Sequence, residues 1–84
     1  MDVQFHSMQD DNLRKALGQR IKQLRKEKGW TQKELASQID SSYAQLNKYE
    51  AGQNTPPLDR LALLAEVLNT TIDFLITGNL SEDM

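Results

Sequence analysis

The side chains best suited to specific chemistry lie in one short stretch, residues 42–48, with the sequence SYAQLNK. Within it, Tyr43, Gln45, Asn47 and Lys48 offer a phenol, two amides and an ammonium group. Amides both donate and accept hydrogen bonds, whereas an ammonium group only donates them. None of these groups forms a nucleophile and base pair, so the stretch is predicted to contact a partner rather than to catalyse a reaction.

Catalysis and metal binding have no comparable support elsewhere in the sequence. The chain contains no cysteine and a single histidine, His6, which has no cluster of cysteines, histidines or carboxylates around it. No glycine-rich phosphate loop and no metal-ligand spacing is present. We therefore expect a protein that is not an enzyme, with no metal, no cofactor and no small-molecule substrate.

Two short helices are predicted to hold this stretch in place. Thr31 and Glu34 have the spacing of a capping box, in which each side chain bonds the other residue's backbone N–H. This signal starts a helix whose apolar face consists of Leu35, Ala36 and Ile39.

The second helix repeats the signal with Ser42 and Gln45 and buries Leu46 and Tyr49 on one face. Only residues 40–41 separate the two helices. A connection this short cannot turn the second helix fully antiparallel, so the two helices are predicted to cross steeply, as in a helix-turn-helix.

Helical periodicity covers most of the remaining chain, and no strand pattern appears. Residues 12–28 form a predicted helix that ends before Gly29, residues 57–68 form another, and residues 71–77 form a last one that ends at Gly78. Their core-facing residues are Leu13, Leu17, Ile21 and Leu24, then Leu61, Leu64, Ala65 and Leu68, then Ile72, Leu75 and Ile76. We expect an all-α domain of five helices over residues 12–78, a mobile N-terminal tail over residues 1–11, and a frayed end over residues 79–84.

The charge of the chain is polarised along its length. The net charge is −2, yet residues 14–53 carry +5, whereas residues 1–13 and 54–84 are acidic. A basic segment of this kind favours an anionic partner such as nucleic acid. The alternative is a solvated basic face whose cations stabilise the C-terminal end of the first helix. No segment has the length of a membrane span or the pattern of a signal peptide, so a cytoplasmic protein is expected.

These features together resemble a known family. The opening LGQRIKQLRKEKGWTQ, the pair Leu35-Ala36, the run from Tyr49 to Gly52, the proline that follows, and Ile72-Asp73 fall in register over residues 17–76. The chain is similar here to the Cro-like, phage-repressor (XRE-type) helix-turn-helix family. The resemblance implies a lambda-repressor-like DNA-binding domain that regulates transcription. It also implies that residues 42–50 enter the major groove and that a homodimer binds a two-fold symmetric operator.

The family's functional positions can be transferred one residue at a time. The resemblance implies base contacts from the stretch defined above, and the residues at those positions are Ser42, Tyr43, Ala44, Gln45, Asn47 and Lys48. It implies phosphate contacts from Gln32, Lys33 and Arg25, and a structural ion pair between Arg25 and Glu50.

The chemistry of these side chains agrees with such roles. Lys48 can donate to guanine, Gln45 and Asn47 can pair with adenine, Ala44 can touch a thymine methyl, and Tyr43 can bond a phosphate or pack on a base edge. The alternatives are that Gln45 is occupied as the partner in the helix cap and that Lys48 is simply solvated.

Three positions depart from the family pattern. The turn between the two helices has Asp40-Ser41 instead of glycine and an aliphatic residue, which predicts a small cost in stability. Ala51 stands where an asparagine or arginine often binds phosphate, and Pro57 replaces the usual serine cap.

Protein partners are expected as well as DNA. Phe74 lies off the core face of the last helix, and together with Leu80 it is a candidate for the dimer interface. The alternative function is an antitoxin or adaptor that uses the same scaffold mainly to hold another protein, which the acidic C-terminal segment favours.

Overall fold

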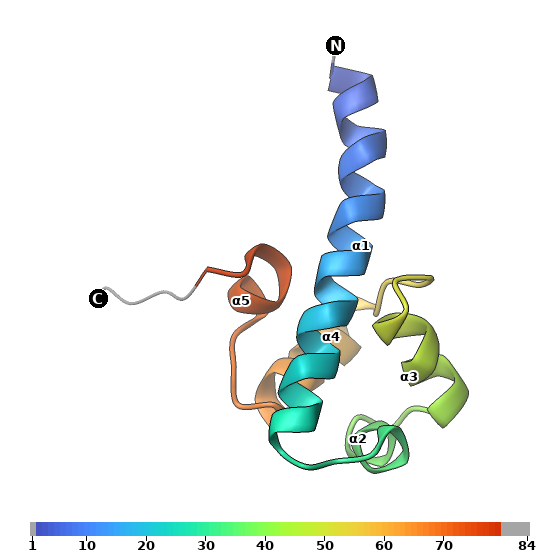
Figure 1. Ribbon diagram of the computed structural model, residues 1–84, viewed down its shortest axis with the longest axis vertical. Helices are drawn as coiled ribbons and strands as arrows, with labels where there is room; N and C mark the ends of the chain where they lie inside the picture. The colour runs from blue at the N-terminus through green and yellow to red at the C-terminus, as the bar shows by residue number, and fades with distance from the viewer. Residues whose placement is uncertain (1, 80–84) are drawn as a thin grey trace.

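The computed structural model describes the backbone of residues 2–79 and the side chains of residues 11–79. Over that part of the chain it has five helices and no strand, which confirms the predicted all-α fold. The helices are α1 (Asp2–Glu27), α2 (Gln32–Gln38), α3 (Tyr43–Glu50), α4 (Leu58–Val67) and α5 (Ile72–Thr77). Figure 1 shows α2 to α5 gathered around the C-terminal half of α1, whose N-terminal half extends beyond them.

The first helix begins earlier than the sequence predicted. α1 starts at Asp2, whereas its start was expected near Asn12 after a tail over residues 1–11. No glycine or proline precedes Gly18, so the segment contains neither of the two strong helix breakers. Met1 and residues 80–84, which include most of the predicted frayed end, lie outside the described residues.

The helix ends agree closely with the predicted signals. α1 ends at Glu27, and Gly29 follows it with a φ of 75°, a left-handed conformation that glycine adopts without strain. The predicted cap of α5 is present, because the Thr71 hydroxyl accepts a hydrogen bond from the Phe74 N–H at 2.9 Å. Pro57 is the N-cap of α4 and makes no side-chain cap. Among the described residues, no helix is long and apolar enough to cross a bilayer.

One apolar core joins all five helices. Its buried members are Leu17, Ile21, Leu35, Ala36, Ile39, Leu46, Tyr49, Leu61, Leu64, Ala65, Leu68 and Leu75. Leu24, Trp30, Val67, Ile72 and Ile76 are partly buried and pack against this core. Leu13 was predicted to belong to it but is 45% exposed, because helical periodicity identifies a face without showing how far along it the partner helices reach.

A close approach between α1 and α3 fixes the position of α3. Gly18 lies against the end of α3, where an added Cβ would stand 2.5 Å from the backbone oxygen of Tyr49 and 2.6 Å from that of Glu50. Only glycine fits at that separation. On the other side of α1, Arg20 donates hydrogen bonds to the carbonyls of Leu75 and Ile76 at 3.0 and 2.9 Å, which ties down α5.

Candidate nucleic-acid interface

The N-terminus of α2 is held by the predicted capping box. The Thr31 hydroxyl accepts a hydrogen bond from the Glu34 N–H at 3.1 Å, and the Glu34 carboxylate accepts one from the Thr31 N–H at 2.8 Å. Two donors that would otherwise lack helical partners are therefore satisfied. Gln32 and Lys33 lie directly after this cap, at the first two positions of α2, with Gln32 half-buried and Lys33 exposed.

The turn between α2 and α3 is tight and uses a left-handed residue. Asp40 has a φ of 57°, and the Ser41 N–H donates to the carbonyl of Ala36 at 2.9 Å. Asp40 thus adopts the conformation that the family's glycine would provide. Figure 1 shows α2 nearly along its axis while α3 lies across the view, in agreement with the expected steep crossing.

The cap of α3 is only partly as predicted. The Ser42 hydroxyl accepts a hydrogen bond from the Gln45 N–H at 3.0 Å. Over the part of the chain that the structure describes, no bond returns from the Gln45 side chain to Ser42. The half-buried amide of Gln45 is therefore not used in the cap and can contact a partner.

α3 presents one free face. Leu46, Tyr49 and Glu50 are buried and attach the helix to the domain. Of the predicted base-contacting residues, Ser42, Tyr43, Ala44, Asn47 and Lys48 are exposed and Gln45 is half-buried. Tyr43 is 52% exposed although it is aromatic, so its ring is not used to build the core. The structure therefore brings the six predicted residues together on an accessible surface.

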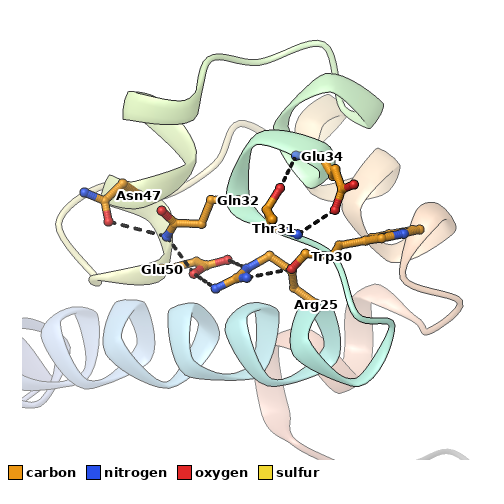
Figure 2. Close-up of polar contacts among 7 residues, drawn as sticks. All are labelled: Arg25, Trp30, Thr31, Gln32, Glu34, Asn47 and Glu50. Atoms are coloured by element: carbon orange, nitrogen blue, oxygen red, sulfur yellow. Dashed lines mark hydrogen bonds and ion pairs between the residues drawn. The ribbon is translucent and has the colours of Figure 1, made fainter.

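Beneath this face lies a buried ion pair between α1 and α3. Arg25 Nε donates to Glu50 Oε2 at 2.7 Å, and Arg25 Nη2 donates to Glu50 Oε1 at 3.0 Å (Figure 2). Arg25 Nη1 donates to the backbone oxygen of Trp30 at 2.8 Å. The expected structural pair is present, and it fixes the end of α3 relative to α1 through two parallel charge-assisted bonds.

The burial of Arg25 argues against its second predicted role. The residue is 8% exposed, and all three of its guanidinium nitrogens donate to protein oxygens. A DNA phosphate has little access to a guanidinium in this position, so the phosphate contact expected from Arg25 is not supported. The sequence could not separate the two roles, because a buried and an exposed arginine have the same sequence signal.

Two amides extend the ion pair to the surface. Gln32 Nε2 donates to Glu50 Oε1 at 2.9 Å and lies 3.5 Å from Asn47 Oδ1 (Figure 2). The side chains of Arg25, Glu50, Gln32 and Asn47 therefore form one polar network from α1 through α2 to the free face of α3. A side-chain phosphate contact from Gln32 would have to compete with Asn47 for the second amide hydrogen.

A groove beside the network, lined by two lysines and two glutamates, was not predicted from the sequence. It lies between α1 and Glu50 of α3, and its α1 lining consists of Gln19, Lys22, Gln23, Lys26 and Glu27. Lys22 and Lys26 are exposed and one helical turn apart. Their i, i+4 spacing on the side of α1 next to Arg25 was the sequence signal that could have identified the groove.

The candidate dimer residues are only partly described. Phe74 is half-buried, and Leu80 lies outside the described residues. Leu13, Leu58 and Leu63 are large apolar residues that are exposed. In the part of the chain that the structure describes, no three His, Cys, Asp or Glu side chains gather where they could hold a metal ion.

The chain is similar in sequence to known proteins of one kind. A family model described as helix-turn-helix matches residues 21–75. The chain is 42% identical over 62 residues to an uncharacterized HTH-type transcriptional regulator of Rickettsia prowazekii, covering 74% of this chain and 48% of that protein. It is 34% identical over 61 residues to the HTH-type transcriptional regulator ImmR of Bacillus subtilis, covering 73% and 48%. It is 33% identical over 60 residues to the HTH-type transcriptional activator BcrR of Enterococcus faecalis, covering 71% and 29%. The chain thus spans about half the length, or less, of these relatives.

Proposed function

The chain belongs to the helix-turn-helix family, and we propose that it is a sequence-specific DNA-binding transcriptional regulator whose helix α3 enters the major groove. The observation that supports this most directly is the free face of α3. Its six polar or small residues are accessible while the opposite face is packed in the core. Family membership also argues against the enzyme alternative.

Within this proposal, the contacts divide into two kinds. Tyr43, Lys48 and their neighbours Ser42, Ala44, Gln45 and Asn47 meet base edges or nearby phosphates. Gln32 and Lys33, at the start of α2, meet the phosphate backbone. The relatives are bacterial proteins, and the proposed site of action is the DNA of the cytoplasm. One of these relatives is named a transcriptional activator, so the proposal covers activation as well as repression.

Selection of bound oligonucleotides from a random pool tests the proposal. We expect recovery of a related set of duplexes with two-fold symmetry. Lys48→Ala should then relax preference at one operator position by about 1–3 kcal/mol. Lys33→Ala should weaken binding to all sequences alike. It should also lower the slope of log affinity against log salt concentration by about 1, the value of one lost phosphate contact. If no duplex is enriched and no DNA binds at low salt, the regulator function is wrong.

We further propose that the protein acts as a homodimer on a symmetric operator. Phe74 is half-buried on α5, so part of the residue is accessible to a second subunit. Sedimentation of the wild type and of Phe74→Glu provides the test. We expect a dimer that dissociates in the variant, and a monomer in both would contradict a dimer in solution.

An antitoxin or adaptor function is the second candidate. It is favoured by the acidic character of residues 54–84, which contrasts with the basic segment before it. Copurification from the native host, followed by identification of any stoichiometric partner, distinguishes the two. A partner that binds without displacing DNA would support both functions together, whereas a partner with no DNA binding would support the adaptor alone.

A further inference from the structure

The carboxylate of Glu50 determines how the Gln32 amide is oriented. Glu50 is paired with Arg25 and is an acceptor-only group, so a neighbour must approach it with a donor. Gln32 does so through Nε2, at 2.9 Å from Glu50 Oε1. The opposite orientation would set the amide oxygen against the carboxylate, which is unfavourable. The Gln32 amide is therefore held with its nitrogen toward Glu50.

The orientation of Gln32 in turn favours one orientation of Asn47. The second hydrogen of Gln32 Nε2 is directed toward Asn47 Oδ1, 3.5 Å away. This hydrogen bond is long and individually weak. It nevertheless favours an inward carbonyl, because an inward amino group would face another donor. Figure 2 shows the result, with Asn47 Oδ1 turned to Gln32 and its amino nitrogen directed away.

From this chain of contacts we infer that Asn47 meets DNA as a hydrogen-bond donor only, with Gln32 as its positioning residue. The inference rests on the proposed DNA-binding function and deepens it. Adenine recognition by asparagine needs the amide carbonyl as well as the amino group, because adenine presents N7 as acceptor and N6 as donor. The carbonyl of Asn47 is occupied by Gln32. Its amino group is left for an acceptor, either a phosphate oxygen or the N7 or O6 atom of guanine.

The electrostatics of the network agree with a donor at this position. Asn47 is exposed on α3, while the nearby carboxylate of Glu50 is buried and neutralised by Arg25. If the Asn47 carbonyl pointed outward, it would add an acceptor, besides the nearby Glu50 carboxylate, to the face of α3 that approaches the electron-rich DNA backbone. An outward amino group instead adds a donor without adding charge. The salt dependence of DNA affinity should therefore be the same in the wild type and in Asn47→Ala.

The test measures affinity by fluorescence anisotropy on a duplex taken from the selection experiment. Asn47→Ala is expected to weaken binding about 2- to 10-fold, the value of one lost hydrogen bond. Asn47→Asp has nearly the same size but replaces the donor with a negatively charged acceptor, so it should weaken binding further. Ser37→Ala, on the exposed side of α2, is the matched control and should bind like the wild type.

Modified duplexes distinguish the two possible acceptors. If the acceptor is guanine, 7-deazaguanine, which lacks N7, or 2-aminopurine, which lacks O6, should reproduce at one position the loss seen with Asn47→Ala. If it is phosphate, a methylphosphonate at one linkage should do so. Either result supports a donor role, whereas a preference for adenine that disappears in Asn47→Ala would overturn it. Unchanged affinity in both Asn47 variants would also overturn it, and in that case wild-type binding shows that the DNA-binding function itself stands.

A double-variant cycle tests whether Gln32 positions Asn47. We expect the effects of Gln32→Ala and Asn47→Ala on binding to be less than additive. Without Gln32 the Asn47 amide is no longer held with its amino group outward, so removing Asn47 should then cost less affinity. Strictly additive effects in proteins with wild-type urea unfolding curves would show that the two residues act independently. That result would overturn the positioning role of Gln32.

Discussion

Replacing Arg25 by methionine should strongly destabilise the domain. Methionine keeps much of the length of the side chain but has no hydrogen-bond donor. It removes the two bonds to the Glu50 carboxylate, at 2.7 and 3.0 Å, and the bond to the Trp30 backbone oxygen at 2.8 Å. Glu50 is 7% exposed, so its carboxylate would remain buried with only Gln32 as a donor. The loss of this pairing, and not the loss of packing, should dominate the change in stability.

The expected loss is about 3–5 kcal/mol, which is typical of removing one partner of a buried ion pair. Hydrogen bonds to charged groups contribute about 1.5–3 kcal/mol each, so the two bonds to Glu50 give a consistent value. For a domain of this size, a loss of about 3 kcal/mol lowers the melting temperature by about 12 °C or more. The loss is large because natural domains are stable by only about 5–15 kcal/mol.

Urea unfolding followed by the fluorescence of Trp30, the single tryptophan, measures this loss. Lys22→Met, an exposed cation on the same helix, is the control and should change stability by less than about 0.5 kcal/mol. In the double variant Arg25→Met with Glu50→Leu, no buried charge is left unpaired, so much of the stability should return. A loss below about 1 kcal/mol for Arg25→Met, or a double variant no more stable than the single one, would refute the reasoning.

Three further changes test the packing of α1 and the turn before α3. Gly18→Ala should destabilise the domain by about 1–3 kcal/mol in thermal unfolding, since its Cβ would stand within 2.6 Å of the backbone oxygens of Tyr49 and Glu50. Asp40→Gly should raise stability by about 0.5–1 kcal/mol in urea unfolding, because Asp40 has a φ of 57°. Ser41→Ala should raise it by about 1 kcal/mol in the same assay, because the buried Ser41 hydroxyl has no hydrogen-bond partner among the described residues.

Each of these changes has a control at a comparable position. Gln19→Ala lies on the exposed side of α1 and should be nearly neutral, so a Gly18→Ala protein as stable as Gln19→Ala would contradict the close approach. Asn69→Gly replaces another non-glycine residue with a positive φ, 60°, and should give a gain similar to that of Asp40→Gly. Ser37→Ala removes an exposed serine hydroxyl on α2. If Ser37→Ala and Ser41→Ala change stability equally, burial of the Ser41 hydroxyl is not the cause of the gain.

The parts of the fold that could be predicted from the sequence are those that depend on local signals. The capping box of Thr31 and Glu34 formed as expected, and so did the Thr71 cap of α5. These signals need only residues within one turn, because each satisfies backbone groups of its own helix. Core positions with clear periodicity, such as Leu61 and Leu64, were predicted for the same reason.

The errors came from properties that are not local. α1 starts earlier than the sequence predicts, because a segment with few apolar residues has the composition of a tail although it contains no glycine or proline to stop the helix. Leu13 has the correct phase for the core, yet it lines a surface groove with Leu17, Leu61 and Ile76. Its exposure depends on where α5 and the segment before α4 end in space. Neither the helical periodicity of α1 nor the residue type of Leu13 indicates where those segments end.

The candidate site shows the same division between local and tertiary information. The resemblance identified both members of the Arg25–Glu50 pair, but it assigned Arg25 a phosphate contact that burial argues against. The contact between Gln32 and Asn47 joins residues 15 positions apart on different helices. It depends on the crossing of α2 and α3 and on the carboxylate beneath them, so no spacing rule could have predicted it.

The same carboxylate therefore has two consequences that experiments must separate. Glu50 stabilises the domain through Arg25, and it orients the surface amides through Gln32. A change at Glu50 would alter folding and recognition together, so reduced DNA binding in that variant would not identify a contact. Gln32 is half-buried and outside the ion pair, so Gln32→Ala removes no atom from the two bonds between Arg25 and Glu50. Changes at Gln32 and Asn47, but not at Glu50, can thus measure how far the buried pair determines what α3 presents to DNA.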